Sequence, residues 1–522
     1  MPNFKPYNYS QDAMIVVNFE EQIQSGTFEH AVHYLISHRL DLSAFYNKYT
    51  NDRGGRSAYD PAILLKIILF AYSKGITSSR EIQWCCEHNI IFKALSCDTV
   101  PHFTTIANFV SSYPDAIEAL FEEVLLVCDQ EGLLGNELFA IDGCKMASDA
   151  SKEWSGTLNE LDQKRKKIRR QLRFSIKEHQ KIDRRRKGEG ERAKRLEQTI
   201  ETLDKAFDKI DSFLKTASPR MGNAKKRKEV KSNITDNESA KMLTSKGTIQ
   251  GFNGLAAVDK KHQIIVEAQA YGDGAEHHTL KPMIEGIKTH YQRTNMSDDI
   301  IATQVVITAD TGFSTENNDR YLKEENINAY IPDNKFRSRD PKFKQQKNKY
   351  GKRHQDTVKG MFKVIPSSEF TFNVKKLTCH CPEGNEMWLK NKVDDGDGKT
   401  TLFFEGKLTD CRACPIKTDC MRNPQSADTR DGHGRQVSTT FTTGKTATDW
   451  MKKRVDSKEG KQIYSHRMSV VEPVFGNIGT NKRLNRFSLR GKEKVQGQWR
   501  LFCLVHNIEK LMNYGQVGRK VA

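Results

Sequence analysis

The chain has 522 residues, too many for a single compact core, and this length predicts two to four domains. Hydrophobic residues make up 37% of the chain, which supports globular folding but indicates long polar or charged insertions. The formal net charge of +18 favours a polyanionic partner, and nucleic acid is the commonest one.

Two observations bear on the class of protein. The best apolar run, AILLKIILFAY at residues 62–72, is short and carries Lys66, so it fits a buried helix better than a membrane span. The N-terminus, MPNFKPYNYSQD, lacks the basic and apolar regions of an export signal. We therefore expect no membrane association and a reducing cytoplasm.

Residues 11–130 have mainly helical periodicity, with a turn at Gly75. A break at Pro101 is followed by a Thr-rich helix start. Short helices with tight turns are compatible with a helix-turn-helix DNA reader whose last helix begins near Thr104. Any small helical bundle would show the same pattern. We predict a helical N-terminal DNA-binding domain at 1–132, with Thr104 and Thr105 as candidate DNA contacts.

The pattern then changes to that of a strand. ELFAIDGCKM at 137–146 predicts a strand that ends in Asp142, with Gly143 directly behind it. Between Leu161 and Lys231 there are 25 Lys and Arg residues against 11 Asp and Glu residues. This segment has two helical patterns joined by RRRKGEGE and one apolar seam, which predicts a basic helical-hairpin insertion at 157–231. The hairpin either contacts nucleic acid or is a solvated tract that binds nothing specific.

Strand patterns resume after the basic insertion. The stretch 247–274 predicts a hairpin that turns near Lys260, and a helix is predicted at about 276–291. A short buried strand at 305–307 leads to Asp310 and a Thr-Gly turn, followed by a helix and the strand INAYIP. This order of elements predicts an α/β fold, with helices on the faces of a mixed sheet.

Three acidic residues are candidates for a metal site. Asp142 and Asp310 each close an apolar strand before a Gly-containing turn, although Asp310 could also be an ordinary helix cap. Carboxylates and water are the usual ligands of Mg²⁺, and a third acid would complete a two-metal site for phosphodiester chemistry. Glu472 is the best third candidate, although Pro473 behind it also fits a glutamate where a helix begins or bends.

At this point the chain resembles a DDE transposase of bacterial insertion sequences. The helical stretch SSREIQWCCEHNIIFKALSCDTVPHFTTIANF is similar to the N-terminal domain of that group. The blocks that resemble the catalytic domain follow in order: FAIDGCKMASDAS, GFNGLAAVDKKHQIIV, VITADTGFSTENN, RMSVVEPVFGNIGTNKRL and RFSLRGKEKVQGQWRLFCLVHNIEKL. The resemblance implies an RNase H-like catalytic domain built from residues 133–156, 232–334 and 461–522.

The resemblance also implies roles for individual residues. Asp142, Asp310 and Glu472 become the catalytic triad, which holds two Mg²⁺ or Mn²⁺ ions. The signature of the family around the last acid assigns Tyr464, Arg467 and Lys482. Four residues separate Arg467 from Glu472 and nine separate Glu472 from Lys482, against three and six in the best-known version. Contacts to DNA phosphates are expected from the residues of this group and two later ones: Tyr464, Arg467, Lys482, Arg490 and Lys492.

Cysteines cluster in a second predicted insertion, at 335–460. Cys411, Cys414 and Cys420 have the spacing C-x2-C-x5-C, and Cys381 lies in a Cys-Pro-x-Gly turn. Four thiolates suit tetrahedral Zn²⁺, so we predict a structural zinc site in which Cys379 or His380 could replace one ligand. The alternative is a set of buried, unligated cysteines. Core packing is expected for the remaining six: Cys85, Cys86, Cys97, Cys128, Cys144 and Cys503.

The sequence thus predicts a bacterial, nucleoid-associated transposase of the cytoplasm. It would bind the terminal inverted repeats of its own insertion sequence in double-stranded DNA, cut the strands and join them to target DNA. Because two ends are joined together, a homodimer or larger assembly on DNA is implied by the resemblance. Two alternatives remain: a nuclease of the same fold that does not transpose, and an inactive DNA-binding relic or regulator.

Overall fold

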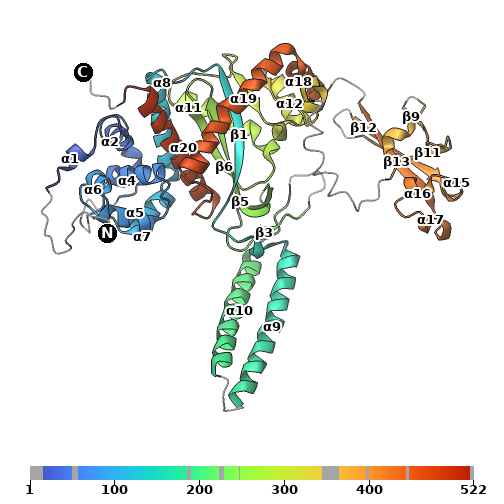
Figure 1. Cartoon of the computed structure of the whole chain (residues 1–522), viewed down its shortest axis with the longest axis horizontal. Helices are drawn as coiled ribbons and strands as arrows, with labels where there is room; N and C mark the ends of the chain where they lie inside the picture. The colour runs from blue at the N-terminus through green and yellow to red at the C-terminus, as the bar shows by residue number, and fades with distance from the viewer. Residues whose placement is uncertain are drawn as a thin grey trace, which may run out of the picture. The chain divides into compact units, whose positions relative to one another are not determined.

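The computed structural model describes residues 16–49, 54, 57–184, 190–222, 228–245, 247–343, 364–374, 376–394, 399–442 and 446–517. The chain divides into two compact units, which are described separately (Figure 1). Unit 1 comprises Met1–Thr308 and His466–Ala522, and unit 2 comprises Ala309–Ser465. The N-terminal stretch considered for an export signal and most of the link RRRKGEGE lie outside the described residues.

The N-terminal part of unit 1 is helical, as the sequence predicts. Gly75 has φ +75°, which allows the chain to turn between two of these helices. Asp60 caps the most apolar helix, and Pro61 occupies its first position, where a missing N–H costs nothing. The helices are α1 (Phe19–Gln22), α2 (Phe28–His38), α3 (Ser43–Tyr46), α4 (Pro61–Ser73), α5 (Ser79–His88), α6 (Ile90–Ser96), α7 (Phe103–Ser112) and α8 (Pro114–Gln130).

A mixed sheet forms the second part of unit 1. Its strands are β1 (Leu138–Ala147), β4 (Ala240–Thr244), β5 (Gly247–Asp259), β6 (Ile265–Tyr271) and β7 (Val306–Ala309). The order is β4-β5-β1-β7, and β6 also pairs with β5. The turn between β5 and β6 lies where the sequence predicts it. The observed fold is therefore mixed α/β with a helical N-terminal region.

The pairing of β1 corrects one expectation. β1 runs antiparallel to β5 from Phe139, opposite Asp259, to Ala147, opposite Gly251. Asp142 therefore lies in the middle of the strand, opposite Ala256, and does not end it. The sequence pattern misses this because Gly143 looks like a turn residue, whereas the long partner strand β5 continues the ladder past it.

One C-terminal helix joins the two parts of unit 1 into a common core. α20 (Lys492–Tyr514) packs against α8, α4 and β6, and Figure 1 shows it beside α8. The rings of Tyr72 on α4 and Phe502 on α20 stack with centroids 4.4 Å apart. On the sheet side, the indole N–H of Trp499 donates to the Leu255 carbonyl at 2.8 Å. α11 (Leu280–Arg293) also packs on β6.

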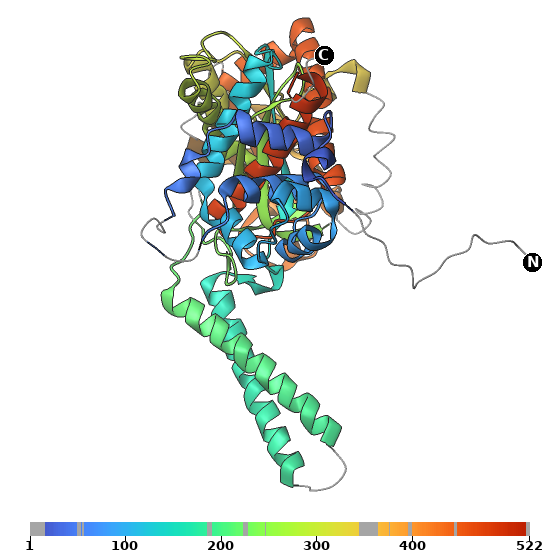
Figure 2. The same ribbon diagram turned by 90° about the vertical axis from the view of Figure 1, so that its left-hand side faces the viewer.

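The basic insertion is a long helical hairpin, as predicted. α9 (Leu158–Arg184) and α10 (Gly190–Thr216) lie side by side in Figures 1 and 2. Leu161, Ile168 and Ile210 are buried between them, with Leu203 and Phe207 packed against this seam. The base of the hairpin is closed by the short strands β2 (Ser155–Gly156) and β3 (Ser232–Asn233).

α19 (Lys458–Gly476) carries Glu472, and a π-helical turn at Asn477–Asn481 follows it. The helix begins at Lys458, so Pro473 lies inside it and does not start it. Proline has no N–H for the carbonyl four residues earlier, which belongs to Ser469. The side chain of Gln263, in the β5–β6 turn, donates to that carbonyl instead at 3.0 Å.

Unit 2 begins with the 3-10 turn η3 (Thr311–Phe313) and α12 (Glu316–Glu324), followed by β8 (Ala329–Tyr330) and α13 (Phe336–Arg339). Later in the unit, α18 (Ala447–Asp456) packs against α12. The chain between α13 and α18 forms a five-stranded sheet of order β13-β12-β11-β10-β9. Its strands are β9 (Thr371–Asn373), β10 (Thr378–His380), β11 (Glu386–Asp394), β12 (Lys399–Lys407) and β13 (His433–Thr442). Three short helices accompany it: α15 (Leu408–Arg412), α16 (Lys417–Cys420) and α17 (Ser426–Thr429).

None of the helices in the described part of the chain has the length and apolar character needed to cross a bilayer.

Candidate functional site

Asp142 is held in place from two sides. Its Oδ1 accepts a hydrogen bond from the Gly143 N–H at 2.9 Å, and its Oδ2 lies 2.6 Å from the guanidinium of Arg467 on α19. The side chain of Arg467 is only 7% exposed and that of Asp142 is 18% exposed. A charge-assisted pair of this length at a half-buried position fixes the carboxylate in one orientation.

Asp310 directly follows β7 and belongs to unit 2. Its Oδ1 accepts from the Thr311 N–H at 2.7 Å, and Asp310 is the N-cap residue of η3. The capping role considered from the sequence is therefore present. A carboxylate keeps further lone pairs when it caps, so this role does not prevent metal binding.

Glu472 is exposed on α19, while its neighbours Val470, Val471 and Val474 are buried. The three valines recur at helical spacing, which places them on one buried face. Glu472 follows Arg467 by five residues, which places it about 7.5 Å further along the helix and about 140° around it. Glu472 therefore projects from a different face of α19 than the arginine that holds Asp142.

Two further signature residues make contacts within their own units. Tyr464 lies in unit 2, where its ring meets that of Phe336 edge-on at 5.5 Å. Lys482 in unit 1 is 1% exposed, and its Nζ lies 2.8 Å from Glu509 on α20. Its ammonium thus faces a carboxylate in the interior, and a contact between Lys482 and DNA stays a prediction.

Arg490 and Lys492 lie at the surface before and at the start of α20. The Nε of Arg490 donates to the Asp149 carbonyl at 2.8 Å, and its Nη2 lies 2.8 Å from the Asp149 carboxylate. The Nζ of Lys492 lies 5.6 Å from the ring centre of Tyr271. Both cationic groups are exposed and can therefore meet a solvent-borne anion.

The helix predicted near Thr104 is α7, which begins at Phe103. His102 caps it by accepting from the Thr104 N–H, and the Thr104 hydroxyl lies 2.7 Å from the His102 ring. Thr104 is exposed and Thr105 is partly buried. Whether either contacts DNA stays a prediction.

The four predicted zinc ligands line a common cavity of about 30 Å³ in unit 2. The Arg435 N–H donates to the Cys411 Sγ at 3.4 Å, and a Cβ at Gly434 would come within 2.5 Å of that sulfur. Among the described residues, only a Glu-Glu-His group has ligand atoms within 4.8 Å of one another, so the thiols surround the cavity at wider spacing.

The structure separates the other cysteines. Cys379 is fully buried against Met387, and His380 is exposed, so neither takes the place of Cys381 at the cavity. Of the six cysteines expected in the core, Cys85, Cys86, Cys128 and Cys503 are buried and Cys144 is partly buried. Cys97 is exposed, which corrects the prediction: it ends α6 in a left-handed conformation and faces solvent.

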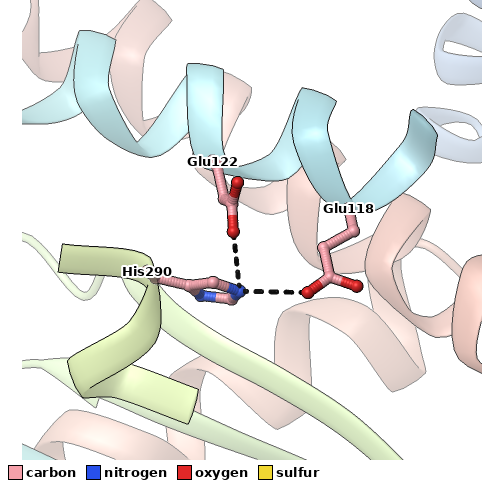
Figure 3. A group of neighbouring side chains, drawn as sticks. All are labelled: Glu118, Glu122 and His290. Carbon is pink, nitrogen blue, oxygen red and sulfur yellow. Dashed lines mark ion pairs between the residues drawn. The ribbon is translucent and has the colours of Figure 1, made fainter. Parts of the chain in front are cut away.

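Sequence patterns do not reveal one further cluster, shown in Figure 3. Glu118 and Glu122 project from α8 one turn apart, toward the ring of His290 on α11. The His290 Nε2 lies 3.9 Å from Glu118 and 3.6 Å from Glu122, and its Nδ1 lies 3.2 Å from the buried Glu267. The three residues drawn are the group whose ligand atoms could hold a metal ion.

The surroundings of His290 favour an ion-pair network over a metal site. Arg500 lies 2.6 Å from Glu118, and Arg293 lies 3.3 Å from Glu118 and 3.1 Å from Glu122. Burial lowers the pKa of His290, but the charges of Glu267 and Glu118 outweigh it and raise the pKa above its ordinary value. With His290 protonated, three carboxylates face three cations, so the cluster is neutral without a metal. Because its members are far apart in sequence, no local motif predicts it.

Two regions of the chain match known protein families. Residues 17–112 match a family described as "Transposase domain (DUF772)", and residues 380–512 match one described as "Transposase DDE domain". The second span contains Glu472 and the four cavity cysteines. A comparison with curated proteins finds no match.

A transposase domain followed by a transposase DDE domain, on an α/β framework, supports a DDE transposase of the insertion-sequence type. Each of the two matches spans less than half of the chain. The resemblance inferred from the sequence blocks is thereby confirmed, and the family implies DNA as its substrate.

Proposed function

We propose that this transposase binds the terminal inverted repeats of its own insertion sequence, cuts the DNA there and joins the freed 3′ ends to target DNA. The observation that carries the proposal is the placement of Asp142. It lies on a central strand of the sheet and is oriented by Arg467, from the helix that also bears Glu472. Such a fixed carboxylate suits chemistry in which positioning and electrostatics dominate.

The pairing of β7 with β1 supports Asp310 as the second acid. The Val306 N–H donates to the Glu137 carbonyl at 2.9 Å, and the Thr308 hydroxyl lies 3.5 Å from the Phe139 carbonyl. β7 therefore runs parallel to β1 in steps of two residues. Asp310 is the first residue after β7. An RNase H-like catalytic fold with Asp310 as the second acid is part of this proposal.

The proposed ligands suit Mg²⁺ or Mn²⁺, since all are carboxylate oxygens. Asp142, Asp310 and Glu472 would hold two ions, which polarise a phosphodiester and activate water or a 3′ hydroxyl for in-line attack. The Gly143 N–H orients one oxygen of Asp142, and Arg467 keeps its charge balanced until substrate binds. Arg467 can then donate to a DNA phosphate, because a guanidinium matches phosphate and carboxylate alike.

In the same proposal, several parts of the chain contact DNA. Helices α5 to α7 would read base edges, while the basic hairpin and the start of α20 contact phosphates. Joining two ends requires at least two protomers on DNA. A DNA substrate places the protein with the bacterial nucleoid in the cytoplasm.

The test is cleavage of a labelled duplex that carries the terminal repeat from DNA flanking the gene, with Mg²⁺ or Mn²⁺. We expect the wild type to cut at the repeat boundary and to join products to target DNA. Asp142→Asn, Asp310→Asn and Glu472→Gln should each lower the rate at least a hundredfold while binding survives. Glu493→Gln is the matched control, since Glu493 is also an exposed helical glutamate in the DDE span.

Two other results would favour the alternative functions. Cutting without joining, on any branched duplex, would replace the proposal by a nuclease that does not transpose. Binding without cutting, in the wild type as in the mutants, would replace it by a DNA-binding relic or regulator.

We also propose that Cys381, Cys411, Cys414 and Cys420 hold one structural Zn²⁺. The cavity they line has the volume of a single ion or water, and zinc would draw the sulfurs in to about 2.3 Å from its centre. The Arg435 N–H already points at the Cys411 sulfur, which stabilises a thiolate. Burial raises the pKa of Cys414 and Cys420. A metal offsets this cost, because zinc ligands are deprotonated.

Elemental analysis of the purified protein tests this site. We expect one zinc per chain, lost in Cys414→Ser. Cys97→Ser, which removes an exposed cysteine away from the cavity, should keep the metal. A wild-type protein that folds without zinc, or an equal zinc content in Cys414→Ser, would contradict the proposal.

A further inference from the structure

A pocket of about 510 Å³ opens on unit 1 where β1 ends and the basic hairpin begins. Four segments of the chain line it: the stretch after β1, the face of α10 near Lys209, Thr235 after β3, and the loop before α20. The residues that line the pocket include Ser148, Asp149, Lys209, Arg486 and Arg490. This pocket lies outside the candidate acids, and Arg490 is the member already expected to contact DNA.

The two arginines of the pocket are fixed by the backbone. The Nε of Arg486 donates to the Ser148 carbonyl at 3.3 Å, and the Nε of Arg490 donates to the Asp149 carbonyl at 2.8 Å. One Nη2 of each lies within 2.8 Å of the Asp149 carboxylate. Each guanidinium therefore keeps donors on its remaining edge, in an orientation set before any ligand arrives.

The charge of the pocket is positive. Arg486, Arg490 and Lys209 outnumber the single carboxylate of Asp149, so a cationic excess remains after the ion pairs are counted. Lys209 also lies 5.4 Å from the ring centre of Trp154, another pocket residue, so its ammonium is held near the opening. An open pocket with spare guanidinium donors suits an anion.

A buried hydroxyl supports the same reading. Ser148 is 2% exposed, and its Oγ has no hydrogen-bond partner among the described residues, although it is part of the pocket wall. Buried hydroxyls in native proteins are rarely left without a partner. Its Oγ has almost no accessible surface in the free protein, so a phosphate oxygen would meet this hydroxyl only after the pocket wall moves.

We propose that this pocket binds a backbone phosphate of DNA, at a fixed distance from the bond that is cut. The distance between this phosphate and the cut bond rests on the proposed catalytic role of Asp142. Ser148 follows Asp142 by six residues, and its N–H continues the ladder to Gln250 at 2.9 Å. Six residues of strand span about 20 Å, which corresponds to about six base pairs of DNA rise. The pocket thus sets the register of the duplex.

The first experiment measures binding of a duplex of arbitrary sequence as a function of salt, so it requires neither cleavage nor repeat recognition. The logarithm of the binding constant falls with the logarithm of salt by about 0.9 per phosphate contact. We expect Arg490→Gln and Lys209→Ala each to reduce this slope by about one contact. Lys260→Ala is the matched control, because it removes the same charge from an exposed position of unit 1 outside the pocket and outside the basic hairpin.

Equal slopes in Lys209→Ala and Lys260→Ala would overturn the pocket and leave a diffuse basic surface. An unchanged slope in Arg490→Gln, with the protein folded by circular dichroism, would do the same. A changed slope in a protein that never cuts DNA would uphold the pocket while the proposed catalytic function fails.

The second experiment locates the phosphate. Single neutral methylphosphonates are placed along a repeat-end duplex, and wild-type affinity is expected to drop about three- to tenfold at one position about six base pairs from the cut. Arg490→Gln should be insensitive at that position only. A drop at no position, or at the same positions in both proteins, would overturn the assignment.

Discussion

Two clusters of charged side chains in unit 1 differ in burial and in balance. Around His290, three carboxylates face two arginines and the imidazolium, and the pairs are mostly buried. Around Asp149, two arginines and a lysine share one carboxylate at the rim of an open pocket. The charges of the first cluster cancel, while the second has a cationic excess and unused guanidinium donors. Charge balance therefore separates a group that holds the fold together from one that awaits a ligand.

The largest expected effect comes from breaking the balanced cluster. His290→Gln leaves Glu267, which is fully buried, without its cation. Removing one partner of a buried ion pair costs about 3–5 kcal/mol of unfolding free energy. Urea denaturation measures this loss, with His88→Gln as an exposed control. A loss below about 1 kcal/mol would mean that the cluster is not structural.

The stability of the His290 cluster should depend on pH. The pKa of His290 is raised in the folded protein, so its contribution is complete below about 6.5 and is lost as pH rises through the folded value. The interaction with His290 and the charge of Arg500 lower the pKa of Glu118 to about 2, against the effect of burial. The contribution of Glu118 is therefore complete above about 4.5 and is lost as pH falls toward 2.

Both contributions are thus complete only between about pH 4.5 and 6.5, and melting temperature measured across pH should fall on either side. In His290→Gln the fall above pH 6.5 should flatten. If wild type and mutant have parallel profiles above that pH, another group is responsible.

The unbalanced cluster should respond in the opposite way. In Arg486→Ala the lost ion pair is 57% and 40% exposed, and such pairs contribute at most about 1 kcal/mol. Stability should therefore change little, while the salt dependence of DNA binding becomes weaker. A loss of stability as large as that expected for His290→Gln would remove the distinction between the two clusters.

The smallest effect is expected for Ser148→Ala. A buried hydroxyl without a protein partner adds nothing to the stability of the free protein, so its removal should be neutral or slightly stabilising. DNA affinity should fall by a few fold, because the phosphate loses one donor. A destabilised Ser148→Ala protein with unchanged DNA affinity would assign the hydroxyl to the fold.

The sequence predicts local features well, because they depend on neighbouring residues. The apolar seam of the hairpin, the hairpin turn near Lys260 and the helix after Pro101 are all confirmed. Strand length is different, since it is set by a partner. β1 continues past Gly143 because β5 pairs with it up to Ala147, and no pattern inside β1 shows this.

The candidate site is only partly predictable for the same reason. The acids stand out because each interrupts an apolar stretch, and their catalytic roles stay predictions. The pairing of Arg467 with Asp142 joins residues 325 positions apart, and Lys482 is buried because Glu509 on α20 faces it. The burial of the Val470 face of α19, by contrast, follows from helical spacing.

Pro473, directly after Glu472 in α19, frees a backbone carbonyl for a contact outside the helix. Pro473 leaves the Ser469 carbonyl to Gln263, and Gln263 also accepts from Lys510 at 2.9 Å, while its carbonyl lies 2.9 Å from the His506 ring. Three segments distant in sequence therefore meet at one glutamine. The backbone hydrogen bond that Pro473 removes from α19 is therefore replaced by a tertiary contact between this helix and the β5–β6 turn. Replacing the proline would restore the N–H and make the Ser469 carbonyl available to it instead of to Gln263.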